Sequence, residues 1–179
     1  KFIKGEYLCT HQGWQSYIVA NEKDPQLFKV DPSIVPLSTY LGTVGMPGRT
    51  AYFGLLRVGL PKSGETIVVS AASGAVGTVV GQMGKILGCR VVGVAGGEEK
   101  CSYVKDELGF DDCIDYKAGN LEEDLTNACP EGIDIYFENV GGPVSRAVAK
   151  NLNPGSRVPI CGFISAYNSE DMSKEETPF

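Results

Sequence analysis

The apolar positions of the chain group into short strand-like runs that alternate with longer stretches of helical periodicity. We predict strands where runs rich in Val and Ile end in turn residues, at Thr66–Ser70, Arg90–Ala95, Asp112–Asp115, Ile133–Glu138 and Ser156–Cys161. We predict helices where apolar residues recur on one face, at Ala75–Leu87, Glu98–Leu108, Leu121–Ala128 and Pro143–Leu152. Strands that alternate with helices favour a parallel sheet with right-handed crossovers. The predicted fold class is therefore α/β, with a doubly wound parallel sheet.

Residues 1–43 differ from this pattern. Large and polar residues alternate over Trp14–Val19, which suits a strand, and Phe28–Asp31 resembles a short edge strand. A segment of this length cannot bury a core of its own. We therefore interpret residues 1–43 as the end of a β-rich domain.

Residues 44–179 form the second predicted domain. It opens with a helical pattern over Thr50–Val58, and Pro47 stands near the start of that pattern, where proline is tolerated. The polar and acidic residues 168–179 are predicted to form a loop. Because Lys1 is not an initiator Met and no sixth strand follows, we expect a fragment or a processed chain.

Composition excludes several classes of function. The 179 residues are 42% hydrophobic and 21% charged, with a net charge of −6. No basic patch is present, so nucleic-acid and anionic-membrane partners are not expected. No apolar run is long enough for a transmembrane span, and the first residues do not resemble a signal peptide.

The cysteines and the single histidine argue against a metal centre. No pair has C-x-x-C spacing, and His11 has no second histidine to accompany it. The lone histidine, in the opening segment, also argues against serine–histidine catalysis. We expect free thiols in a reducing cytoplasm, at Cys9, Cys89, Cys101, Cys113, Cys129 and Cys161.

The turn after the first long strand carries the strongest chemical signal. Residues 72–77 (ASGAVG) match the G-x-G-x-x-G pattern with Ala in the first position, and they lie between a predicted strand and a predicted helix. Gly74 would let the backbone approach a pyrophosphate, and Gly77 would let the helix pack close to the strand. Free amides and the dipole at a helix N-terminus favour an anion. We predict a Rossmann-type dinucleotide site, with a purely structural turn as the alternative.

The end of the second strand favours NADP over NAD. NAD enzymes usually carry an acidic residue there for the ribose hydroxyls, whereas this chain has Gly96 and Gly97. Lys100 follows in the first helical turn and can supply positive charge. Alternatively, Lys100 is only a solvent-exposed lysine of the helix. The acidic Glu98 and Glu99 would stabilise the helix N-terminus while they point to solvent.

Two later segments follow strands at the edge where a ligand would bind. In residues 138–142, Asn139 can donate and accept hydrogen bonds beside two glycines. Residues 161–168 would present backbone amides and the Tyr167 hydroxyl. Tyr167 could equally be an exposed loop aromatic.

Four motifs in order give the chain a family resemblance: residues 41–52 (LGTVGMPGRTAY), 71–77 (AASGAVG), 137–142 (FENVGG) and 161–168 (CGFISAYN). Together they resemble the zinc-independent medium-chain dehydrogenases/reductases, within the prostaglandin reductase/leukotriene hydroxydehydrogenase group and its bacterial curcumin reductases. The resemblance covers essentially the whole chain.

The resemblance implies an NADPH-dependent reductase of the carbon–carbon double bond in α,β-unsaturated ketones and aldehydes. Such enzymes are commonly dimeric and cytoplasmic, with a GroES-like catalytic domain and a Rossmann domain. Residues 1–43 would be the remnant of the former, and the fragment alone would then lack part of its active site. Hydride addition to the β-carbon would leave an enolate, which Tyr167 would stabilise before protonation. No metal is expected.

By the same resemblance, the residues expected to contact NADP are Met46, Pro47, Thr50, Ser73, Gly74, Ala75, Val76, Gly77, Gly96, Lys100, Tyr116, Asn139, Cys161, Gly162, Phe163, Ile164, Ser165 and Tyr167. Among these, Lys100 and Tyr116 match positions at the 2′-phosphate end. Arg49 differs from the family pattern, in which this position is occupied by an apolar residue. Two alternatives stay open: a quinone reductase of the same superfamily, and an NADP-binding chain without turnover. A methyltransferase is disfavoured by the glycines at 96 and 97.

Overall fold

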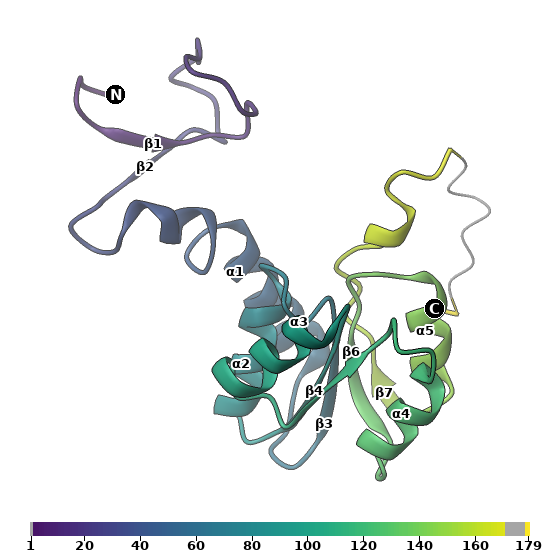
Figure 1. Ribbon diagram of the computed structural model, residues 1–179. Helices are drawn as coiled ribbons and strands as arrows, with labels where there is room; N and C mark the ends of the chain where they lie inside the picture. The colour runs from purple at the N-terminus through teal and green to yellow at the C-terminus, as the bar shows by residue number, and fades with distance from the viewer. Residues whose placement is uncertain (1, 171–177) are drawn as a thin grey trace.

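The computed structural model describes residues 2–170 and 178–179, and its core is a five-stranded parallel sheet. The strands lie in the order β5-β4-β3-β6-β7 (Figure 1). Their bounds are β3 Thr66–Ser70, β4 Arg90–Ala95, β5 Asp112–Asp115, β6 Ile133–Phe137 and β7 Leu152–Arg157. The central position of the first strand of the series, with later strands added on both sides, is the Rossmann arrangement. The predicted fold class is confirmed.

Among the described residues, five α-helices cover the two faces of this sheet: α1 Met46–Phe53, α2 Gly77–Ile86, α3 Glu98–Ser102, α4 Leu121–Ala128 and α5 Gly142–Ala149. Apolar residues of α1, α2 and α3 share one core cluster with alternate strand residues such as Ile67 and Val69. Those of α4 and α5 share the other cluster with Val68 and Val92. Because both faces are covered, all five residues of β3 are buried, which explains its uninterrupted apolar run.

Two of the predicted helices end in a π-helical turn, Gly54–Gly59 after α1 and Tyr103–Glu107 after α3. The helix predicted over Thr50–Val58 begins four residues earlier in the structure, at Met46, and its second half is the π-helical turn. The helix predicted from Ala75 begins at Gly77, because residues 71–76 form the turn that precedes it. Short 3-10 helices lie at Leu37–Leu41 and Ile164–Ala166.

The last strand lies earlier than predicted. The structure pairs Ile133 with Leu152 and Ile135 with Arg157, so β7 replaces the end of the predicted helix over Pro143–Leu152. Of the predicted strand over Ser156–Cys161, Ser156 and Arg157 belong to β7, and the rest forms only an isolated bridge between Glu138 and Ile160. Edge strands tolerate proline and glycine, and β7 contains both within its sequence LNPGSR.

The opening segment stands apart from the sheet in Figure 1. It holds an antiparallel pair, β1 Tyr7–Cys9 and β2 Phe28–Val30, so the predicted strand at Phe28 is confirmed. The predicted strand over Trp14–Val19 is wrong: these residues are irregular, and Trp14, Tyr17 and Val19 are almost fully exposed. An alternating pattern does not form a strand without a partner for its backbone groups.

Part of the loop predicted over 168–179, residues 171–177, lies outside the described residues. None of the helices in the described chain has the length and apolar character needed to cross a bilayer.

Candidate functional site

A cavity of about 650 Å³ opens at the carboxyl edge of the sheet. This is the edge where open α/β sheets bind their ligands. Its lining comes from the end of β4, from the segments that follow the sheet strands, and from α3, α4 and α5: Ala71, Ser73, Gly74, Val94, Ala95, Gly96, Lys100, Tyr116, Leu121, Val140, Gly141, Pro143, Val144, Ile164 and Ser165. The predicted residues Ser73, Gly74, Gly96, Lys100, Tyr116, Ile164 and Ser165 are thus brought together.

The turn between β3 and α2 presents unused backbone donors. Within the described chain, the amides of Ser73, Ala75, Val76 and Gly77 donate to no protein acceptor. Ala71, the first residue of the turn, has a left-handed φ of 49°, a conformation that costs a non-glycine residue energy and is enriched at ligand-binding turns. Donors free at a helix N-terminus form a binding site for an anion such as a pyrophosphate.

Gly77 has a steric role in this turn. A Cβ atom there would lie 2.3 Å from the carbonyl oxygen of Ala71 and 2.9 Å from the Cα atom of Ala72. Both are backbone atoms and cannot move aside cheaply. A side chain at residue 77 would push α2 away from the end of β3, as expected for the third glycine of the pattern.

The N-terminus of α5 also lies near the cavity, but a side chain of the protein already occupies it. Glu138, fully buried, follows β6 and accepts hydrogen bonds from the amides of Val140 (2.7 Å) and Gly141 (3.0 Å). Gly141 is the N-terminal cap residue of α5. Since these amides are used, the free amides before α2 are the better place for a phosphate group.

Three hydroxyl groups complete the surroundings of Glu138. Its oxygens accept from Tyr136 (2.8 Å), Ser70 (3.2 Å) and Ser145. Burial, with the nearby Glu138 carboxylate, raises the pKa of Tyr136 far above its usual value. The phenol therefore remains a hydrogen-bond donor. The network of five donors compensates the loss of water around a buried carboxylate.

One end of the cavity combines a cation with a phenol. Lys100 of α3 and Tyr116, which follows β5, line it beside Gly96. A Cβ at residue 96 would lie 2.9 Å from the Tyr116 hydroxyl oxygen, so a glycine is needed for the ring to lie there. The described lining contains no acidic side chain, and Glu98 and Glu99 are exposed outside it. This end can accept a further negative charge.

The other end is formed by two loops that hold each other. The carbonyl oxygen of Val140 accepts from the amide (3.0 Å) and the hydroxyl (2.6 Å) of Ser165. Asn139 does not line the cavity: its side-chain amide donates to the carbonyl of Ser70 (2.7 Å), and its backbone amide donates to the Ser70 hydroxyl (2.8 Å). Asn139 thus joins the ends of β3 and β6.

The remaining predicted contacts lie outside the cavity lining: Met46, Pro47, Thr50, Ala75, Val76, Gly77, Cys161, Gly162, Phe163 and Tyr167. Tyr167 is 63% exposed, and its hydroxyl oxygen would be 2.4 Å from a Cβ on Gly162. The phenol therefore lies against the main chain of its own loop. Met46 is exposed, and its sulfur is 3.4 Å from the Thr50 hydroxyl.

Sequence reasoning missed the apolar part of the lining: Ala71, Val94, Ala95, Leu121, Val140, Gly141, Pro143 and Val144. Val94 and Ala95 could have been found, because they end a predicted strand at the ligand-binding edge. Leu121 and Val144 belong to α4 and α5, and only the packing of both helices on one face brings them here.

The thiols do not form a reactive centre. Burial raises the pKa of Cys129 to about 11 and raises those of Cys113 and Cys161 as well, which disfavours the nucleophilic thiolate. Over residues 2–170 and 178–179, no group of three His, Cys, Asp or Glu side chains is placed to hold a metal ion.

Comparison with known proteins places the chain among dehydrogenases. The family model described as "Zinc-binding dehydrogenase" matches residues 75–177. The chain is 51% identical to the NADPH-dependent curcumin reductase of Escherichia coli over 96% of its own length and 49% of the relative's. It is 51% identical to prostaglandin reductase 1 of Oryctolagus cuniculus over 92% and 48%.

A solved structure is similar over the whole chain. The crystal structure of CurA in complex with NADPH from Vibrio vulnificus superimposes with a TM-score of 0.88 and 52% identity, covering 100% of this chain and 52% of that one. The chain spans about half the length of the curated relatives that it matches.

Proposed function

The chain belongs to the zinc-binding dehydrogenase family, within the medium-chain dehydrogenases/reductases, and we propose that it is the NADPH-binding part of an enone reductase. The enzyme would reduce the carbon–carbon double bond of α,β-unsaturated ketones and aldehydes. One observation carries the proposal: the turn with free amides before α2 contributes Ser73 and Gly74 to a cavity that Lys100 also lines, and the described lining contains no carboxylate. The names of relatives at about 50% identity support the same cofactor and reaction.

The residues present suit this cofactor. The amides of Ser73 and of residues 75–77 would hold the pyrophosphate. Lys100 and Tyr116 would hold the 2′-phosphate through a cation and a hydroxyl donor. The loops that contain Asn139 and Ser165 would lie beside the nicotinamide end. When bound, NADPH supplies a hydride, which is the hard part of the chemistry.

The protein would then act on the charge that develops in the substrate. Addition of hydride to the β-carbon places negative charge on the carbonyl oxygen, and a fixed donor there lowers the barrier. We propose Tyr167 as this donor, directly or through a ribose hydroxyl. Solvent can deliver the proton to the α-carbon, so no dedicated acid is required.

The remaining properties are proposed from the resemblance. Residues 1–43 would belong to a GroES-like domain, which their separate β1–β2 pair supports. The reaction would proceed without zinc, since residues 41–51 contain no cysteine, whereas the zinc-dependent alcohol dehydrogenases carry a metal-binding cysteine in this stretch. The enzyme would be a cytoplasmic homodimer.

A fluorescence titration of the chain with NADPH and NADH tests the cofactor. We expect NADPH to bind at least about tenfold more tightly, or about 1.4 kcal/mol. Lys100→Ala should narrow the difference because it removes a charge-assisted contact. Lys105→Ala, at an exposed position in the π-helical turn that follows α3, is the matched control and should leave the difference intact. Equal affinities in the unaltered chain would contradict the proposal.

Oxidation of NADPH, followed by its absorbance, tests the reaction in the complete protein. Enones should support turnover. Oxidation by quinones alone would favour a quinone reductase, and tight NADPH binding without oxidation by either class would favour a binding protein.

A further inference from the structure

Asp115 connects the two turns that end β4 and β5. One carboxylate oxygen of Asp115 accepts from the backbone amide of Gly97 (2.8 Å) and from that of Lys117 (2.9 Å). The bond to Lys117 spans two residues and is of the Asx-turn type, which many aspartates form. The bond to Gly97 reaches 18 residues back along the chain to the other turn, and a local turn does not require it.

The two connected turns carry the residues at the cation-containing end of the cavity. A Cβ on Gly96 would lie 2.8 Å from the Tyr116 ring and 3.0 Å from the Cε atom of Lys117. Lys100 stands in the helix that begins after Gly97, and it lines the cavity with Tyr116. The relative position of Lys100 and Tyr116 therefore depends on how the two turns are held together.

Asp115 itself does not line this cavity. Both amides donate to the same oxygen of its carboxylate, and these hydrogen bonds hold its pKa below the usual value. A carboxylate so close to a phosphate site would ordinarily weaken binding by repulsion. Here, its position outside the lining and its two amide donors indicate a mechanical role.

We propose that Asp115 is a positioning residue for cofactor selection: by joining Gly97 to Lys117, it sets Lys100 and Tyr116 at the spacing that a 2′-phosphate requires. This inference rests on the proposed function. The hydrogen bond from the Lys117 amide to Asp115 also holds Lys117, which the family resemblance did not single out, near Gly96.

Asp115→Ala tests the inference through the dissociation constants of NADPH and NADH, measured by fluorescence on the chain. We expect the preference for NADPH to fall by about fivefold, the equivalent of one hydrogen bond of about 1 kcal/mol. The loss should fall on NADPH, because NADH has no 2′-phosphate. Asp115→Asn keeps a carbonyl oxygen as acceptor and should retain most of the preference.

Asp111→Ala is the matched control. Asp111 also accepts a backbone amide, from Val91 at 2.7 Å, but it lies at the opposite end of β5 and outside the cavity. It should lower the melting temperature and leave the NADPH preference unchanged. If Asp115→Ala does not fold, Asp115→Glu displaces the oxygen while keeping the charge, and it should also lower the preference.

The outcomes separate the two proposals. An unaltered chain without preference for NADPH would contradict the proposed function. A preference that Asp115→Ala leaves unchanged would overturn only the role of Asp115. Equal weakening of both cofactors would mean a general structural role, and tighter NADPH binding would mean simple charge repulsion. Either result would also overturn the inference.

Discussion

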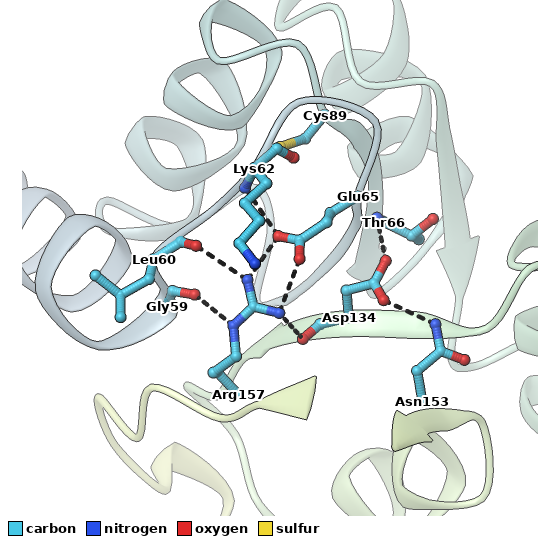
Figure 2. Close-up of polar contacts among 9 residues, drawn as sticks. All are labelled: Gly59, Leu60, Lys62, Glu65, Thr66, Cys89, Asp134, Asn153 and Arg157. Carbon is cyan, nitrogen blue, oxygen red and sulfur yellow. Dashed lines mark hydrogen bonds and ion pairs between the residues drawn. The ribbon is translucent and has the colours of Figure 1, made fainter. Parts of the chain in front are cut away.

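Arg157 and Glu65 face each other through two parallel contacts, 2.6 Å and 3.0 Å long, at the amino-terminal edge of the sheet (Figure 2). The same guanidinium donates to the carbonyl oxygens of Gly59 (2.8 Å) and Leu60 (3.0 Å). These carbonyls end the π-helical turn after α1. One side chain of β7 thus connects the end of the π-helical turn after α1 to the segment just before β3, at the edge opposite the cavity.

Arg157→Lys should lower the free energy of unfolding by about 1–2 kcal/mol, because an ammonium group cannot reproduce the planar fork. Urea denaturation measures the change. Lys150→Ala is the control: Lys150 pairs with Glu122, but both side chains are 61% exposed, against 25% for Arg157 and 18% for Glu65. The control should change stability by less than about 0.5 kcal/mol, and a larger loss there would contradict the comparison.

Glu65 should contribute to the loss of stability in acid. The hydrogen bond from Arg157 is the main cause that holds the pKa of Glu65 below its ordinary value of 4.5. A carboxylate with a lowered pKa stabilises the fold at any pH above the unfolded value, and the contribution is lost as the pH falls through the folded value. Glu65→Gln should be less stable at pH 7 and should lose less between pH 5 and pH 3, as measured by urea denaturation at each pH. Parallel curves would disprove the linkage.

Local patterns were sufficient for β3, β4 and β5 and insufficient for β7 and for the opening segment. The bounds of β3, β4 and β5 agree with the prediction. For β3 and β4 the reason is that central strands of a parallel sheet have continuous apolar runs that end in turns. In β7, only pairing with β6 selects Leu152–Arg157. The exposed residues of Trp14–Val19 have a strand pattern but no described partner strand.

The candidate site was predictable where one motif contains the chemistry. The turn over residues 72–77 lies where its glycines indicated. The roles of Glu138, Asp115 and Arg157 could not be predicted, because each joins segments that are far apart in the sequence. No periodicity along the chain records which strands become neighbours.

The stability of the fold should depend on Glu138 as a hydrogen-bond acceptor and much less on its negative charge. Four donors converge on one of its oxygens, among them the amides of Val140 and Gly141. Glu138→Leu leaves them unpartnered in the interior, and it should cost about 3–5 kcal/mol of unfolding free energy. Glu138→Gln keeps that oxygen, and Ser145 can rotate to accept from the new amide. It should cost only about 1 kcal/mol, and an equal loss in both variants would contradict this account.

Tyr167 and Gly162 should act together in turnover. Tyr167→Phe should lower the rate of NADPH oxidation by an enone at least about tenfold, because a donor to the developing charge is lost, while NADPH affinity changes by less than about threefold. Gly162→Ala would place a Cβ 2.4 Å from the Tyr167 hydroxyl and displace it, so it too should slow turnover. In the Phe background, the closest remaining ring atom is 3.6 Å away, an ordinary contact. The two substitutions in the complete protein should therefore be strongly non-additive. Additive losses, or an unchanged rate in Tyr167→Phe, would remove Tyr167 from the mechanism.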